Sequence, residues 1–150
     1  MRLAPRWLDG PARAEAAEAW RATGSVRLEG VLADDVATTV RDAIAALAHP
    51  LIAGAAPDFA YQYGALSSPP EERCDHLWCQ FARWWWVDGV ALVDSITGMR
   101  LRPPRDRVLT STLFRRGSFI DPHNDFDRTR RCAYVLGLTD QAWPHELGGH

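Results

Sequence analysis

Apolar residues recur at helical spacing through much of the first two thirds of the chain. Within residues 33–48 they form a single stripe made of Val36, Val40, Ile44 and Leu47. Carboxylates at positions 34 and 35 suit the start of a helix, because the helix dipole favours negative charge there. We therefore predict a helix over residues 33–48. Helices are also predicted over the alanine-rich residues 11–21 and within residues 71–97, with a break near Asp88 and Gly89.

Alternating apolar and polar positions predict short strands, most of them in the second half of the chain. Phe59, Tyr61 and Tyr63 alternate within residues 51–66, and residues 25–31 and 107–114 show the same period of two. Residues 131–138 form a strongly apolar run that is typical of a strand. Gly117 indicates a turn or bulge. Helices first and short strands afterwards predict an α+β domain.

Three adjacent tryptophans, residues 84–86, lie within the predicted helical region. Neighbouring side chains on a helix point about 100° apart, so the three indoles cannot share one face. We expect this bulk to pack in the hydrophobic core, with at least one indole partly exposed.

Composition is that of an ordinary globular domain, with 47% apolar and 24% charged residues in 150. A single domain over residues 1–150 is expected at this length. No apolar run approaches the roughly 20 residues that span a bilayer, and no secretory signal is visible. We therefore expect a cytoplasmic protein without a membrane partner, and no nucleic-acid partner.

All 17 basic residues are arginine, which excludes chemistry that depends on a lysine of these residues. Residues 1–99 hold 8 arginines against 13 acidic residues, whereas residues 100–150 hold 9 against 6. A basic C-terminal part suits an anionic cosubstrate. It is equally compatible with a solvated, arginine-rich surface.

The three cysteines, Cys74, Cys79 and Cys132, are an odd number without a secretory context, so we expect reduced thiols. A zinc site that includes His76 is not favoured, because no fourth ligand lies nearby in the sequence.

One motif carries chemistry: His123 and Asp125 stand two residues apart in a segment that reads as extended. Side chains at positions i and i+2 of a strand point to the same side. An imidazole and a carboxylate placed in this way are two of the three ligands of a two-histidine, one-carboxylate iron site.

From about residue 20 onward the chain resembles the prolyl 4-hydroxylase-like group of iron(II)- and 2-oxoglutarate-dependent oxygenases. The resemblance rests on an ordered set of features: the Phe-Arg-Arg-Gly-Ser-Phe run at residues 114–119, His123-x-Asp125, the apolar run at residues 132–138, Trp143, and Gly148-Gly149. Residues 24–32 before a helix also resemble the opening strand of this group.

The resemblance implies a double-stranded β-helix, which is a jelly-roll barrel, with a helical layer at its N-terminal side. It implies hydroxylation of a peptidyl substrate, such as a prolyl residue, or of a small-molecule substrate, with release of succinate and carbon dioxide. Fe(II) would be bound by His123 and Asp125, and the cosubstrate 2-oxoglutarate by Tyr134 and Arg131, with ascorbate as an optional further cofactor. The group's second histidine and its carboxylate-binding Arg or Lys lie further along, so we expect this chain to be the N-terminal part of such a domain.

Alternative roles exist for each of these residues. His123 suits a surface turn after Pro122, and Asp125 suits an ion pair with a neighbouring arginine. Arg131 suits a structural ion pair, and Phe114 stands where the group often has a tyrosine whose hydroxyl touches the cosubstrate. His145 and His150 are further candidates for the third iron ligand, but neither stands where the group has it.

Two other functions remain open. A barrel that has lost catalysis would serve as a binding or interaction module. A cupin-type metal protein would keep the metal without 2-oxoglutarate. A downstream histidine with a suitable basic residue favours the oxygenase, and a downstream histidine alone favours the cupin type.

Overall fold

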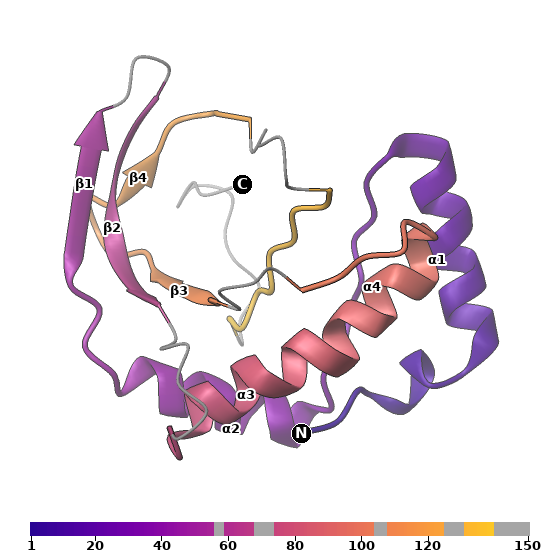
Figure 1. Cartoon of the computed structure of the whole chain (residues 1–150). Helices are drawn as coiled ribbons and strands as arrows, with labels where there is room; N and C mark the ends of the chain where they lie inside the picture. The colour runs from indigo at the N-terminus through magenta and orange to yellow at the C-terminus, as the bar shows by residue number, and fades with distance from the viewer. Residues whose placement is uncertain (56–58, 68–73, 104–107, 125–130, 140–150) are drawn as a thin grey trace.

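A four-stranded antiparallel sheet lies beside a layer of helices in the computed structural model of the chain (Figure 1). The structure describes residues 1–55, 59–67, 74–103, 108–124 and 131–139. The helices are α1 (Gly10–Thr23), α2 (Asp34–Ala45), α3 (Leu77–Trp84) and α4 (Val90–Thr97), and the strands are β1 (Leu51–Ala55), β2 (Ala60–Ser67), β3 (Thr110–Leu113) and β4 (Phe119–Ile120). The α+β class is therefore confirmed. The described strands form this one sheet, and a second sheet, which a double-stranded β-helix requires, is not among them.

The first two predicted helices are confirmed, α1 in the alanine-rich segment and α2 in the segment with helical spacing. Helix α1 ends at Gly24, whose positive φ of 71° forms a left-handed cap that a residue with a side chain adopts with strain. In α2, Val40 and Ile44 are buried, and Val36 and Leu47 pack against the same core. The last turn ends three residues earlier than predicted.

Helices α3 and α4 are not separated by the predicted break. A π-helical turn, Trp85–Gly89, joins them into one continuous rod. Gly89 lies against the Trp85 ring so closely that a Cβ atom there would stand 2.4 Å from a ring carbon. The glycine that suggested a helix end instead makes room for an indole.

The triple tryptophan behaves as expected. Trp85 is buried, whereas Trp84 and Trp86 are half-buried at the edge of the same cluster. Phe81 packs between Trp78, Trp84 and Trp85 with ring centroids about 6 Å apart. This aromatic cluster is the centre of the helical layer.

Strand β2 is the middle of the sheet. Strand β1 pairs with one of its edges, and both β3 and β4 pair with the other. The predicted strand character of residues 51–66 is confirmed, as a hairpin rather than a single strand. The strand predicted over residues 107–114 is confirmed in a shorter form, β3, although residues 104–107 lie outside the described part.

The strand predicted over residues 25–31 is wrong. Val26 and Leu28 do pack against the core, but the nearest pairing is a single bridge between Leu3 and Leu32. The carbonyl groups of Glu29 and Gly30 instead accept hydrogen bonds from the Trp7 indole, at 3.0 Å each. The segment is held by the Trp7 side chain and by one backbone hydrogen bond, from the Ala4 N–H to the Val31 carbonyl at 2.9 Å, and not by a paired strand.

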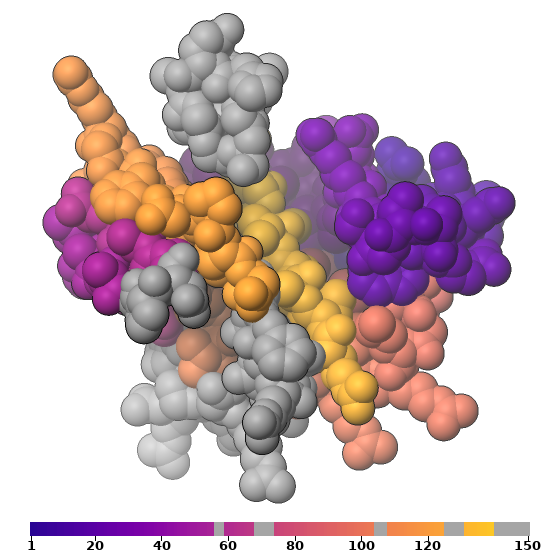
Figure 2. Space-filling model, turned by 90° about the horizontal axis from the view of Figure 1, so that it is seen from above, coloured from indigo at the N-terminus to yellow at the C-terminus, as the bar shows by residue number. Residues whose placement is uncertain are grey.

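The strand predicted over residues 131–138 is not formed, although half-buried and exposed side chains alternate along residues 131–139. Tyr134, Leu136 and Leu138 pack against the core, whereas Val135 is 97% exposed. Figure 2 shows this segment in yellow, between the strands on one side and α1 and α4 on the other. A strand needs a hydrogen-bonded neighbour, and the described residues place none beside this segment.

The expected reduced state of the cysteines is contradicted for two of the three. Cys74 and Cys79 form a disulfide at the start of α3, and Cys132 is a free thiol. Two sulfurs bonded to each other are not thiolate ligands, so the zinc cluster is excluded in this state. The sequence spacing did not reveal that the first turn of α3 brings the two side chains together.

None of the described helices is both long and apolar enough to cross a membrane.

Candidate functional site

The segment that carries His123 is clamped to the start of β2. The backbone N–H of Asp121 donates to the Ala60 carbonyl at 2.9 Å, and the backbone N–H of Ala60 donates to the Asp121 carboxylate at 3.0 Å. These two reciprocal bonds continue the pairing of β4 with β2 by one residue. They place His123 two residues beyond the last point of attachment to the sheet.

The imidazole of His123 has a defined orientation. Its ring stacks on Phe59, with centroids 4.7 Å apart and planes inclined by 19°. Its Nδ1 atom lies 2.9 Å from the Asp121 carbonyl oxygen. A carbonyl only accepts, so in the neutral ring Nδ1 carries the hydrogen and Nε2 carries the lone pair. This backbone bond is the kind that fixes the tautomer of metal-binding histidines.

Phe59 is the end of a continuous row of aromatic rings on one face of the sheet. The row passes from Phe59 to Tyr61, Tyr63 and Phe114, with successive centroids 5.8, 5.6 and 5.4 Å apart. Because alternate residues of a strand share a face, the period of two in β2 produces this row. We call these four residues the aromatic row.

Gly54 leaves space for the Tyr61 ring of the aromatic row. On the neighbouring strand β1, a Cβ atom at this position would stand 2.7 Å from the Tyr61 hydroxyl oxygen. The Tyr61 ring therefore lies across the space where a side chain of β1 would be. The row and the His123 ring together form one aromatic surface of five rings.

Several predicted site residues lie outside the described residues. Asp125 is among them, as are Trp143, His145, Gly148, Gly149 and His150. Their placement relative to His123 stays a prediction. Within the described part of the chain, no group of three His, Cys, Asp or Glu side chains is positioned to hold a metal ion.

Tyr134 lies in the helical layer. Its ring contacts Trp85 at 5.1 Å and Trp86 at 6.3 Å, and no described ring of the aromatic row. Burial raises the pKa of Tyr134 to about 12. The phenol therefore stays protonated over the physiological range and packs as a core aromatic. Arg131 is exposed, and no ion pair of it occurs among the described residues, so the expected structural ion pair is not seen.

The aromatic row was the part of the site that the sequence reasoning missed. The period of two at Phe59, Tyr61 and Tyr63 predicted a strand, but nothing in the sequence connected that strand to His123, about 60 positions later. Tyr63 stacks on Phe114, the residue that lacks the hydroxyl expected at its position. The structure thus places a phenol beside the phenylalanine.

Comparison with known proteins found no matching family model, no matching curated protein and no matching solved structure.

Proposed function

We propose that this chain carries the iron-binding motif of an Fe(II)- and 2-oxoglutarate-dependent dioxygenase of the prolyl 4-hydroxylase-like group. The observation that carries the proposal is the orientation of His123. Its Nδ1–H donates to a backbone carbonyl and its ring is stacked on Phe59, and these two contacts hold the ring as in histidines that bind metal through Nε2.

The donor types of the motif fit Fe(II). An imidazole nitrogen from His123 and a carboxylate oxygen from Asp125 belong to the two-histidine, one-carboxylate set, which leaves positions open for a cosubstrate and dioxygen. When bound, iron with 2-oxoglutarate supplies the oxidising power for hydroxylation, with succinate and carbon dioxide as coproducts. The residues of this chain contribute placement: Asp121 positions the histidine, and Phe59 limits the rotation of its ring.

The aromatic row suits the wall of a substrate pocket. It begins at the His123 ring and carries two phenol groups on an otherwise apolar surface. Tyr63, next to Phe114, is a candidate to supply the hydroxyl that Phe114 lacks. A peptidyl or small-molecule substrate would lie against these rings, which exclude water from the metal side of the sheet.

The fold is compatible with the jelly-roll architecture that this function implies. The sheet is antiparallel, a layer of helices lies beside it, and residues 131–139 pack alternate side chains on the helical core. We propose that this segment, which has no strand neighbour among the described residues, becomes a strand of a second sheet when a partner strand pairs with it. Hydrogen exchange of its amides tests this, because unpaired amides exchange rapidly.

The function is tested first by metal affinity. Fe(II) is titrated anaerobically into the wild-type chain, His123→Ala and Asp125→Ala, with and without 2-oxoglutarate, by isothermal calorimetry. Loss of a ligand should weaken binding by at least about 100-fold, since even second-layer changes cost about 10- to 100-fold. Succinate release is measured in parallel.

His49→Ala is the matched control. This histidine already uses both ring nitrogens, towards the Leu47 carbonyl and the Ser111 hydroxyl at 3.0 Å each, so its loss should leave iron affinity unchanged. Equal Fe(II) affinity in the wild type and in His123→Ala would refute the site assignment.

A second function, that of an interaction module without catalysis, is favoured by one observation. The sheet exposes large apolar side chains at its ends: Leu51, Ile52, Phe119 and Ile120. These residues belong to β1 and β4, on the two opposite edges of β2, and exposed apolar groups at sheet edges are candidates for contact with a partner. The same Fe(II) titration separates the two functions. If the chain is only an interaction module, the wild type should bind Fe(II) no better than the His123→Ala variant does.

A further inference from the structure

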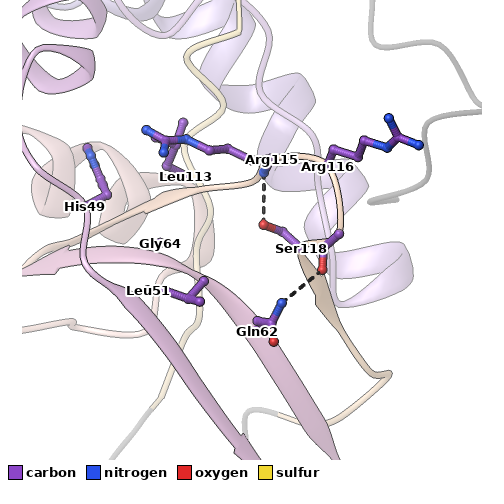
Figure 3. A pocket seen from close by; sticks show the side chains of 9 residues that line it. His49, Leu51, Gln62, Gly64, Leu113, Arg115, Arg116 and Ser118 are labelled. Atoms are coloured by element: carbon purple, nitrogen blue, oxygen red, sulfur yellow. Dashed lines mark hydrogen bonds between the residues drawn. The ribbon is translucent and has the colours of Figure 1, made fainter.

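A small cleft of about 220 Å³ lies where the turn after β3 approaches β1 and β2 (Figure 3). Gln62 and Gly64 of β2 contribute to its lining. They alternate with Tyr61 and Tyr63, so the cleft is on the face of the sheet opposite to the aromatic row. It is therefore separate from the proposed iron site.

The cleft exists because one edge of β2 is paired with an interrupted strand. Leu113, the last residue of β3, lies opposite Gly64, and Phe119, the first of β4, lies opposite Gln62. Positions of β2 that are two apart thus face residues that are six apart in the sequence. Residues 114–118 leave the ladder as a bulge, and such bulges re-aim side chains.

The bulge is a closed and ordered turn. The backbone N–H of Ser118 donates to the Arg115 carbonyl at 2.8 Å, and the backbone N–H of Arg115 donates to the Ser118 hydroxyl oxygen at 3.0 Å. Gly117 has a φ of 86°, which a residue with a side chain adopts only with strain. The turn holds Arg115 and Ser118 in a fixed relation to β2.

Gly64 and His49 shape the opposite side of the cleft. A Cβ atom at position 64 would stand 3.0 Å from the His49 Cβ and 3.1 Å from its carbonyl oxygen, so Gly64 leaves the floor of the cleft bare. Both nitrogens of the His49 ring are engaged, with Leu47 and Ser111. His49 therefore shapes the cleft and does not act as its ligand group.

The groups that face the cleft are hydrogen-bond donors. The Arg115 guanidinium forms no ion pair, and no acidic side chain lines the cleft, within the part of the chain that the structure describes. The Ser118 hydroxyl accepts one bond and keeps its own hydrogen to donate. Gln62 donates to the Gly117 carbonyl at 3.4 Å through an amide that has two hydrogens.

Arg115 and Arg116 both border the cleft, but Figure 3 shows that their side chains extend in different directions. The Arg115 side chain extends back past Leu113 toward His49, whereas Arg116 extends in the opposite direction. A guanidinium over a small cleft with hydroxyl and amide donors matches the oxygen atoms of a carboxylate or phosphate.

We propose that this cleft binds a compact oxyanion, the carboxylate or phosphate group of a small ligand, through Arg115, Ser118 and Gln62. The volume is below the roughly 300–1,000 Å³ of typical ligand pockets, so the ligand is small or only its anionic group enters. This site is independent of the iron proposal and would survive its failure.

The test is a titration of the isotope-labelled, metal-free chain, followed by two-dimensional NMR at low ionic strength. Inorganic phosphate and malonate are added separately up to about 50 mM, a range that covers millimolar affinity. Saturable shifts are expected for the amides of residues 115–118 and for the Gln62 side chain. The tighter of the two probes identifies the preferred oxyanion.

Three variants decide whether the cleft itself binds. Arg115→Gln should weaken binding about tenfold or more, because hydrogen bonds to charged groups contribute about 1.5–3 kcal/mol. Gln62→Glu, which places a carboxylate in the cleft, should weaken it similarly. Arg116→Gln removes the same charge from the neighbouring position and should cost less than about threefold, as expected for long-range attraction.

Two outcomes would overturn the proposal. One is the absence of saturable shifts with either probe. The other is equal weakening by Arg115→Gln and Arg116→Gln, which would show general attraction to a basic surface. Amide spectra of the free variants verify that each retains the fold, which is expected because both arginines are exposed.

Discussion

The helical layer and the sheet use similar side chains in opposite ways. Phe81 in α3 is 2% exposed and is surrounded by indoles, whereas Phe119 in β4 is 45% exposed. Leu92 in α4 is 1% exposed, whereas Leu51 in β1 is 68% exposed. The difference indicates that the helical layer provides the stability and that the sheet presents side chains on its surface.

The reason lies in where each element finds its backbone hydrogen bonds. A helix satisfies its own N–H and C=O groups, so the helical layer needs only apolar side chains to pack. A strand pairs these groups only with a neighbouring strand, and an edge strand leaves one row of them to solvent. Within the described residues, β1 has a neighbour on one edge, and residues 131–139 have none, although Leu136 and Leu138 reach the core.

The largest expected effect is the contrast between the two phenylalanines. Phe81→Ala should lower the free energy of unfolding by about 3–5 kcal/mol, because it opens a cavity inside the aromatic cluster. Phe119→Ala should change it by less than about 1 kcal/mol, because its ring is half in water. Urea unfolding followed by tryptophan fluorescence measures both. Equal losses would mean that the sheet is as integral to stability as the helices.

Two glycines give a finer contrast. Gly89→Ala places a methyl group against the buried Trp85 ring, which cannot move, and should cost about 1–3 kcal/mol. Gly54→Ala meets only the outer end of the Tyr61 side chain, which can swing aside, so the cost should stay within about 1 kcal/mol. Thermal unfolding of both variants tests this. A tolerated Gly89→Ala would show that the aromatic cluster repacks freely.

The smallest expected effect is a pH dependence from Tyr134, where residues 131–139 meet the helices. Burial raises its pKa from 10.0 to about 12, so the unfolded chain ionises first. This contribution to stability is complete below pH 10 and is lost as pH rises through about 12. In Tyr134→Phe, the free energy of unfolding should fall less steeply with pH in this range than in the wild type. Urea unfolding midpoints of the wild type and Tyr134→Phe at pH 9 and pH 11.5 test this. An identical change in midpoint for the two proteins would mean that the phenol is hydrated in the folded chain.

Helical spacing was the most reliable guide to the fold. Val40 and Ile44 are buried as predicted, because a helix places every third or fourth residue on one face whatever its neighbours do. Period-two patterns were less reliable. Residues 60–67 became a strand, but residues 25–31 did not, because alternation records which side is buried and not whether a partner strand is present.

The site was predictable only in part. The spacing of His123 and Asp125 suggested iron ligands, and the sequence around them suggested a family, but Asp125 lies outside the described residues. The aromatic row joins Phe59 to Phe114, and the disulfide joins Cys74 to Cys79. Neither relation could be deduced, since each depends on a register or a turn that other parts of the chain set.

The sequence by itself determined helices α1 and α2, the α+β class and the candidate chemistry of His123, because these follow from local spacing and residue type. Tertiary structure alone decided that Trp7 replaces a strand neighbour for residues 29 and 30, that residues 114–118 bulge from the sheet, and that His123 stacks on Phe59. The physical reason is that hydrogen-bond partners and ring contacts between distant segments depend on the whole fold.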